Sequence, residues 1–443
     1  MKMTIDHKQI RNVAVFMTLL YAFTTRSILA KFLFQNQIEL LAFYGVTYVC
    51  LIVSVIGAFF YDGVHLYAPK GFFSILTLFL VIFYGLIVAH NNYSLLYYGL
   101  ALLMPFAVFN EIKNTTFYAR LFAVMAVFFT VGCVVNFIVP STFKAIFYPL
   151  YSASAQQSLL EVERISGTST YFAGFTSQVG YTSFFISLGV GAVFCFKDTI
   201  YKKSWAFLMA IMFSGLLLTG KRGPIVFLLV ALLSIYFFSG YGKDQIIRFV
   251  KIIGIIVAAV ILLGVIANVT KIDGIIRIYN AVYEFLTAGS VDDAGRNQLH
   301  EQALRFFEEN PIFGIGWTNF RVMYSFRSTH VHCIYLQLLC ETGLVGFGIF
   351  VTFFATRLIN TLSLVRKTRL TGNMQEGGWI KFSFFIQLYF LLYGITGNPL
   401  YDIEETIMYF FAIGISYLPL LSSDNNIGGK SNENCYFNFP VCS

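Results

Sequence analysis

Apolar runs of about 20 residues recur along almost the whole chain, and they limit the possible folds more than any other feature. A helix of that length crosses the hydrocarbon layer of a bilayer. The chain is 57% hydrophobic and only 12% charged, whereas soluble domains carry about 25% charged residues. Transmembrane barrels would instead show short alternating segments. The sequence therefore predicts an all-α polytopic membrane protein.

We expect about 12 membrane-spanning helices, one for each apolar run. The approximate runs are 12–33, 38–60, 71–90, 93–111, 118–140, 171–196, 204–220, 223–240, 252–270, 332–356, 380–397 and 405–422. The seventh and eighth are short and nearly continuous, which suits either one hairpin or a broken, tilted pair. The aromatic residues, 18% of the chain, are expected mainly at lipid-facing and interfacial positions. We expect residues 1–422 to form one transmembrane domain and residues 423–443 to be a polar cytoplasmic tail.

The Lys and Arg residues of the short loops indicate the orientation, because cytoplasmic loops carry an excess of them. They gather in loops on the side of the N-terminus, so both termini are expected in the cytoplasm. The same bias accounts for the net charge of +8 without a nucleic-acid partner. The seven cysteines lie mostly in or beside apolar runs, which argues against a disulfide framework.

The longest polar segment, residues 271–331, lies on the outer side in this orientation. It is far longer than a helix connection needs, and long loops are usually functional or disordered. Apolar side chains recur at helical spacing within it, at Leu299, Ala303, Phe306 and Phe307. Asp292 or Asp293 would cap a helix over 294–309, and Asn310-Pro311 would end it. We expect this helix to lie along the outer membrane–water boundary.

The stretch Thr219–Pro224 places two adjacent cations, Lys221 and Arg222, between the seventh and eighth runs. One interpretation is a hairpin turn whose cations reach the lipid headgroups. The other is a phosphate site, because the guanidinium of an arginine offers a bidentate fork for phosphate. The sequence leaves both interpretations open.

The long outer segment holds four arginines, which are Arg296, Arg305, Arg321 and Arg327. On a helix, Arg296 and Arg305 would fall about 180° apart, so one site would not use both. Arg296 lies near the helix start, where a cation opposes the helix dipole. That position favours a separate role, with a solvated surface charge as the alternative. Arg321 and Arg327 are candidate contacts for phosphate or a lipid headgroup.

His330 and His332 directly precede the tenth run. A histidine is the natural proton acceptor near neutral pH, and the mouth of a spanning helix would be partly dry. Interfacial histidines bonded to the backbone are the structural alternative. The string His330-Val331-His332-Cys333 also suggests zinc, but no further His lies at a useful spacing. We expect neither a metal ion nor a cofactor.

Acidic and amide side chains occur in and between the last three apolar runs. The turn Gly397–Asp402 holds Asn398 and Asp402, which suit either an ordinary loop or contacts with sugar hydroxyls. Glu341 lies inside the tenth run, where a carboxylate is costly unless it is paired. We expect Glu341 to have an Arg partner or a role in proton transfer.

Four short motifs occur in a fixed order along residues 170–405. They are T-x-x-R-G at Thr219–Gly223, G-R at Gly295-Arg296, N-P-x-x-G-x-G-x-x-N-F at Asn310–Phe320, and H-x-H followed by Y-L-Q-x-x-x-E-x-G-x-x-G at His330–Gly346. In this order they resemble the O-antigen ligase and O-antigen polymerase superfamily of bacterial membrane glycosyltransferases. One position departs from the pattern: the family usually has Asn after the second His, and this chain has Cys333.

The resemblance implies a GT-C-like helical architecture in the inner membrane, with a periplasmic loop over a cavity in the outer leaflet. It implies a donor glycan carried on undecaprenyl pyrophosphate and a glycosyl transfer that inverts the anomeric carbon without a metal ion. Arg222 and Arg296 match the family's pyrophosphate-binding arginines, with Lys221 beside them, and His332 matches the catalytic base. Possible supporting residues are His330, Arg321, Arg327, Glu341, Asn398 and Asp402. A chain-length regulator is a possible partner.

Three functions compete. An O-antigen polymerase joins lipid-linked repeat units, whereas a ligase transfers the glycan to lipid A–core. The Gly397–Asp402 turn and the high Phe and Tyr content favour the polymerase. A flippase of lipid-linked oligosaccharides is the third reading, but transporters often show internal repeats, and none is found here.

Overall fold

A computed structural model describes residues 7–34, 37–61, 65–68, 72–88, 93–108, 116–151, 155–156, 159–160, 171–240, 243–271, 276, 279–280, 296–324, 329–371, 374–416 and 437–438. Most of these residues are helical. The longer helices are α1 (His7–Thr24), α3 (Gln37–Phe59), α4 (Phe72–Val88), α5 (Tyr93–Val108), α6 (Phe117–Ile138), α9 (Val179–Cys195), α10 (Trp205–Leu218), α11 (Arg222–Phe238), α12 (Lys243–Thr270), α14 (Asn297–Glu309), α16 (Ile334–Thr371), α17 (Met374–Tyr393) and α18 (Ile403–Ser416). The short elements are α2 (Leu29–Leu33), α7 (Pro140–Phe147), the 3₁₀ helix η2 (Tyr148–Leu150), α15 (Phe320–Met323), and the strands β1 (Phe60–Tyr61), β2 (His65–Ala68) and β3 (Phe437–Asn438), which pair antiparallel in that order.

Every apolar run of the sequence overlaps one of the longer helices. Within the described part of the chain, four helices are long and apolar enough to cross a membrane by length and composition, over Glu39–Ile56, Phe117–Ile138, Lys243–Thr270 and Ile334–Thr368. The prediction of a helical membrane protein is confirmed at this level, while the number of spans stays a prediction. The seventh and eighth runs are two separate helices, α10 and α11, joined by the turn at 219–221.

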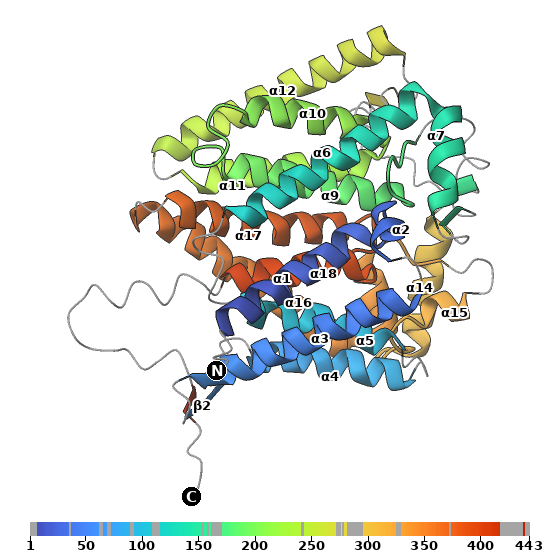
Figure 1. Cartoon of the computed structure of the whole chain (residues 1–443), viewed down its shortest axis with the longest axis vertical. Helices are drawn as coiled ribbons and strands as arrows, with labels where there is room; N and C mark the ends of the chain where they lie inside the picture. The colour runs from blue at the N-terminus through green and yellow to red at the C-terminus, as the bar shows by residue number, and fades with distance from the viewer. Residues whose placement is uncertain are drawn as a thin grey trace, which may run out of the picture.

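The long helices pack side by side in layers (Figure 1). α10, α11 and α12 lie along one edge, α6 and α9 come next, and α3, α4 and α5 lie at the opposite edge. Between them, α18 packs against α5 and α17, and α16 packs against α17. This arrangement brings the last helices of the chain against the first ones.

Aromatic side chains fill the centre of this bundle. Phe122 of α6 lies with its ring centroid 5.3 Å from that of Phe23 in α1 and 5.0 Å from that of Phe382 in α17. Among the described residues, the largest fully buried side chains are all aromatic, among them Trp317, Trp379 and Tyr389. The expectation of mainly lipid-facing and interfacial aromatics is therefore wrong for this set. Helices in lipid gain from close packing between them, and large rings supply much of that contact.

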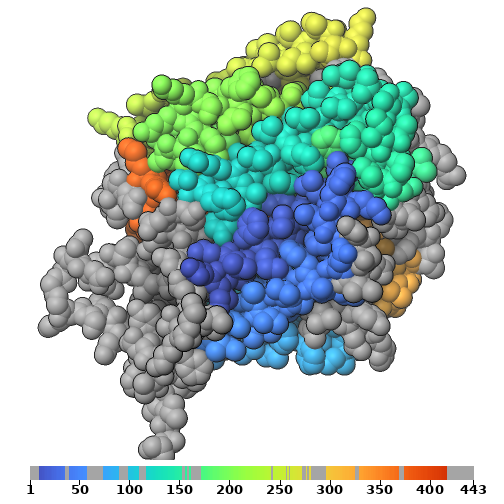
Figure 2. All heavy atoms as spheres, in the orientation of Figure 1, coloured from blue at the N-terminus to red at the C-terminus, as the bar shows by residue number. Residues whose placement is uncertain are grey.

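The outer surface of the bundle is apolar. On the face in Figure 2, α3 and α6 lie at the surface, and their exposed side chains include Leu41, Val49, Val124 and Val131. Large apolar side chains that face outward suit lipid rather than water.

The amphipathic helix of the long outer segment is confirmed as α14, Asn297–Glu309. Ala303 and Phe306 are buried, and Leu299 and Phe307 pack beside them. The helix ends at Asn310 as expected, but its N-cap residue is Arg296, which makes no side-chain cap hydrogen bond. The expected caps Asp292 and Asp293 lie outside the described residues. In Figure 1, α14, α15 and α7 lie together at one end of the bundle, opposite the end where α1 begins.

Candidate catalytic site

The segment 310–320 fits into a break in α16. Gly343 has φ 62° and ψ −170°, which interrupts the helical hydrogen bonds. The N–H of Ile315 donates to the carbonyl oxygen of Cys340 (3.0 Å), and the N–H of Gly316 donates to that of Glu341 (2.9 Å). In return, the N–H of Leu344 donates to the carbonyl oxygen of Pro311 (2.9 Å). The two motifs therefore satisfy the backbone groups that the break exposes.

Two glycines make this close approach possible. A Cβ on Gly314 would lie 2.3 Å from the carbonyl carbon of Glu341, and a Cβ on Gly343 would lie 2.3 Å from that of Ile312. Both residues also have φ above +60°, where a side chain is disfavoured. The glycines of the two motifs are thus required by the contact between them.

Glu341 is fully buried beneath this segment. Its carboxylate accepts hydrogen bonds from the N–H of Thr318 (2.8 Å), the N–H of Phe320 (3.2 Å) and Nε2 of Gln337 (3.1 Å). The expected Arg partner is absent among the described residues, and backbone amides take its place. Because these contacts fix the turn that leads into α15, Glu341 has a clear role in shaping the loop. Its role in proton transfer stays a prediction.

The two histidines lie in the segment just before α16. Gln337 Nε2 lies 3.0 Å from His330 Nδ1, and the His330 ring lies 5.4 Å from the ring of Tyr401. Burial lowers the pKa of His330, and the nearby charges of Arg321 and Arg26 lower it further, against the opposing effect of Asp402.

His332 has the least ordinary backbone of the segment, with φ 61°. A non-glycine residue in this region stores strain, and such strain gathers at functional sites. Its Nε2 lies 3.5 Å from Thr329 Oγ1. Burial, followed by the charges of Arg296 and Lys221, lowers the pKa of His332 to about 4. The imidazole is therefore neutral at physiological pH and able to accept a proton.

The cations that surround His332 come from two distant parts of the chain. Arg296 Nη1 donates to the carbonyl oxygen of Thr396 (3.1 Å), in the loop before α18. Gly223 reaches the same residue, because a Cβ on it would lie 2.9 Å from Thr396 Oγ1. Lys221 lies two residues before Gly223, and burial followed by the charge of Arg296 lowers its pKa. The Thr219–Pro224 turn and Arg296 thus meet at the same loop residue, Thr396.

Residues 207–351 match the family model described as O-antigen ligase. This region of the chain is similar to that family. This match confirms the resemblance to the O-antigen ligase and polymerase superfamily. No curated protein sequence matches the chain.

The matched region, residues 207–351, runs from α10 into α16 and includes most of the cluster just described. Lys221, Arg222, Arg296 and His332 all lie within it. Arg222 is the first residue of α11, beside Gly223. Arg321 is exposed on α15, and Arg305 is exposed on α14. Arg327 lies outside the described residues.

Arg26 is the main site residue that the sequence did not single out. Its Nη2 lies 2.7 Å from Asp402 Oδ1, and its Nε lies 3.1 Å from Glu404 Oε1. Desolvation opposes its charge, but Glu404, Asp402 and Glu405 together raise the pKa of Arg26 well above its ordinary value. Arg26 and Glu404 are 378 positions apart, so no local spacing pointed to the pair.

Most of the turn before α18 is buried, and it contacts both the matched region 207–351 and Arg26. Asn398 is 6% exposed, and its carbonyl oxygen accepts the N–H of Tyr401 (2.9 Å). The ring of Tyr401 stacks on Trp317 at 5.0 Å between centroids. Cys333, at the position of the family Asn, is half-buried, and its carbonyl oxygen accepts the N–H of Gln337 (3.0 Å).

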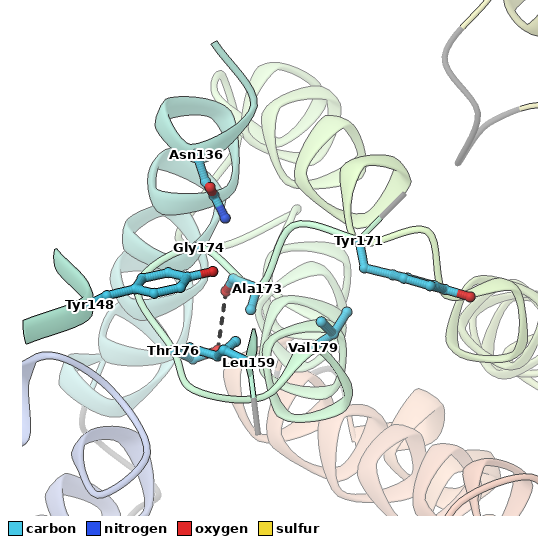
Figure 3. Close-up of a pocket in the computed structure, with 8 residues that line it drawn as sticks. All are labelled: Asn136, Tyr148, Leu159, Tyr171, Ala173, Gly174, Thr176 and Val179. Carbon is cyan, nitrogen blue, oxygen red and sulfur yellow. Dashed lines mark hydrogen bonds between the residues drawn. The ribbon is translucent and has the colours of Figure 1, made fainter. Parts of the chain in front are cut away.

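A small pocket lies beside Lys221, one of the two cations near His332 (Figure 3). It is lined by Asn136, Tyr148, Leu159, Tyr171, Ala173, Gly174, Thr176 and Val179. Tyr171 points away from the other polar side chains of the pocket, and Lys221 Nζ lies 5.4 Å from the centroid of its ring. Tyr171 thus lies between this pocket and Lys221.

Among the described residues, no three His, Cys, Asp or Glu side chains are placed to hold a metal ion.

Proposed function

We propose that the protein is an O-antigen polymerase. It joins undecaprenyl-pyrophosphate-linked repeat units at the periplasmic face of the inner membrane. The observation that carries the proposal is the neutral His332 flanked by Arg296 and Lys221 within the matched region 207–351. A proton acceptor beside fixed cations suits a transfer that releases pyrophosphate.

The donor side of the reaction uses the cations. The bond between the anomeric carbon and the pyrophosphate oxygen breaks, and its electron pair leaves with the pyrophosphate. Arg296, Arg222 and Lys221 stabilise the negative charge that develops, and their fixed positions avoid reorganisation during the reaction. Because these side chains supply the positive charge, the mechanism requires no metal ion.

The acceptor side uses His332. A hydroxyl of the acceptor sugar attacks the anomeric carbon from the face opposite the pyrophosphate, so the new bond forms with inversion. His332 takes the hydroxyl proton. A bound pyrophosphate offsets the charges of Arg296 and Lys221, which lower the pKa of His332 in the free protein. The base therefore becomes stronger when the donor is present.

The apolar surface of the bundle suits the lipid part of such a donor. The exposed side chains of α3 and α6 would face the bilayer, with both termini in the cytoplasm and α14 on the periplasmic side. A GT-C-like arrangement would then place the site at the outer leaflet. A chain-length regulator is a possible partner in the same membrane.

The second candidate is an O-antigen ligase, and the family match supports either function equally. A ligase uses the same donor and the same leaving group, and its acceptor is lipid A–core. The Gly397–Asp402 turn and the aromatic content support the polymerase.

Deletion of the gene separates the two functions. A polymerase deletion leaves lipopolysaccharide core bearing one repeat unit. A ligase deletion leaves bare core, with polymer retained on the carrier lipid. A full ladder of chain lengths on the core would contradict both. Complementation with Arg222→Ala and with His332→Ala tests the flippase reading, because intact surface polysaccharide in both would favour transport over catalysis.

A further inference from the structure

The backbone N–H of Val331 holds the Gln337 amide in one orientation, and the contact with Glu341 agrees with it. The N–H of Val331 can only donate, so the Gln337 atom that faces it at 3.2 Å is the carbonyl oxygen Oε1. The carboxylate of Glu341 accepts two backbone N–H groups, and Gln337 Nε2 donates to it at 3.1 Å. Both contacts fit the same placement of the amide group.

This orientation fixes which nitrogen of His330 carries the proton. The amide Nε2 of Gln337 faces His330 Nδ1 at 3.0 Å, and this nitrogen of an amide can only donate. His330 Nδ1 therefore accepts the hydrogen bond. In a neutral imidazole the proton then resides on Nε2. Burial has the largest effect on His330 and lowers its pKa, which favours the neutral imidazole.

The surroundings of His330 differ from those of His332. His332 has Arg296 and Lys221 as charged neighbours, which suits a pyrophosphate. His330 instead lies against the ring of Tyr401, with the Asp402 carboxylate nearby. An aromatic face, a carboxylate and a neutral donor are groups that suit a sugar better than a phosphate.

We propose that His330 donates a hydrogen bond from Nε2 to a sugar oxygen of the substrate, and that Gln337 is the positioning residue that sets this tautomer. The inference rests on the proposed glycosyl transfer for the identity of the substrate. The two histidines then have opposite roles: His332 accepts a proton, and His330 donates a hydrogen bond. The relay from Glu341 through Gln337 gives Glu341 a second role besides shaping the loop.

The tautomer is tested directly by nitrogen NMR of the purified protein with ¹⁵N-labelled histidine. The chain has six histidines, and His330→Gln assigns the relevant signals. At neutral pH we expect the Nε2–H tautomer for His330, and a mixture of tautomers in Gln337→Met. Gln387→Met is the matched control, because Gln387 is also fully buried and bonded, to Thr361 and Ser383 in α16 and α17. An Nδ1–H tautomer in the unaltered protein, or a tautomer unchanged by Gln337→Met, overturns the proposal.

The donor role is tested by comparing two substitutions of His330. The amide nitrogen of a glutamine can replace Nε2–H, whereas leucine cannot. We expect His330→Leu to lower kcat/KM by roughly 100-fold, the usual effect of removing one preorganised donor, and His330→Gln to recover at least about a tenth of the original value. His332→Gln should show no such recovery, because glutamine cannot accept the proton. Equal losses in His330→Gln and His330→Leu, with unchanged thermal unfolding, contradict the donor role. If the unaltered protein transfers no sugar, the proposed function fails, while the NMR result still decides the tautomer.

Discussion

Arg26 Nη2 lies 2.7 Å from Asp402 Oδ1, so the end of α1 is bound to the turn that precedes α18. The contact joins the first long helix of the chain to the last one. It also holds the turn that contains Tyr401, which packs against His330. A pair outside the matched region 207–351 thus fixes one wall of the site.

Replacement of Arg26 tests this link. Arg26→Met leaves Asp402 and the buried Glu404 without their cation, so we expect a loss of about 1–3 kcal/mol in stability and a lower midpoint of thermal unfolding in detergent. Adding Asp402→Asn to Arg26→Met should recover part of the loss, because one uncompensated charge is removed. Lys31→Met is the control, since Lys31 is exposed nearby on α2. Equal midpoints for Arg26→Met and Lys31→Met would show that the pair contributes nothing.

The break in α16 gives a second test. Gly343→Ala forces a side chain into a position with φ 62° and toward Ile312, so we expect a destabilisation of roughly 1–3 kcal/mol or more. Gly348→Ala, five residues later in the same helix, has open space around its Cβ and should stabilise the protein by about 0.5–1 kcal/mol. Thermal unfolding of both variants measures the difference. A Gly343→Ala variant as stable as Gly348→Ala would mean that segment 310–320 does not occupy the break.

The pH dependence of the reaction tests the charges around His332. A base must be unprotonated, so kcat/KM should fall as the pH drops through the His332 pKa, which is about 4 in the free protein. Lys221 lowers that pKa. Lys221→Ala should therefore move the acid limb of the kcat/KM profile to higher pH, whereas Lys221→Arg, which keeps the charge, should leave it in place. An acid limb that stays fixed or moves downward in Lys221→Ala would refute this assignment.

The positions of the helices followed from the sequence because apolar runs and helical spacing report local structure. Each run overlaps an observed helix, although α12, α16 and α17 extend beyond their runs, and α14 buries Ala303 and Phe306 as its pattern required. The turn at 219–221 was also marked by its Gly and cations.

Contacts between distant segments could not be predicted from the spacing of residues in the sequence. The ion pair of Arg26 depends on how α1 and α18 meet, which no spacing records. One of the two expectations for Glu341, an Arg partner, was wrong because backbone N–H groups carry no sequence signature. The amides of Thr318 and Phe320 bind its carboxylate instead. The aromatic side chains were placed outward for a related reason, since composition does not say which rings meet inside the bundle.

The central claim is that His332 accepts a proton during glycosyl transfer from a pyrophosphate-linked donor. The most direct measurement uses the purified protein in lipid vesicles with undecaprenyl-pyrophosphate-linked repeat units, and follows both chain extension and release of the lipid pyrophosphate. We predict chain extension by the unaltered protein and a loss of at least about 100-fold in His332→Ala, with an unchanged midpoint of thermal unfolding. Full chain extension by His332→Ala would contradict the account.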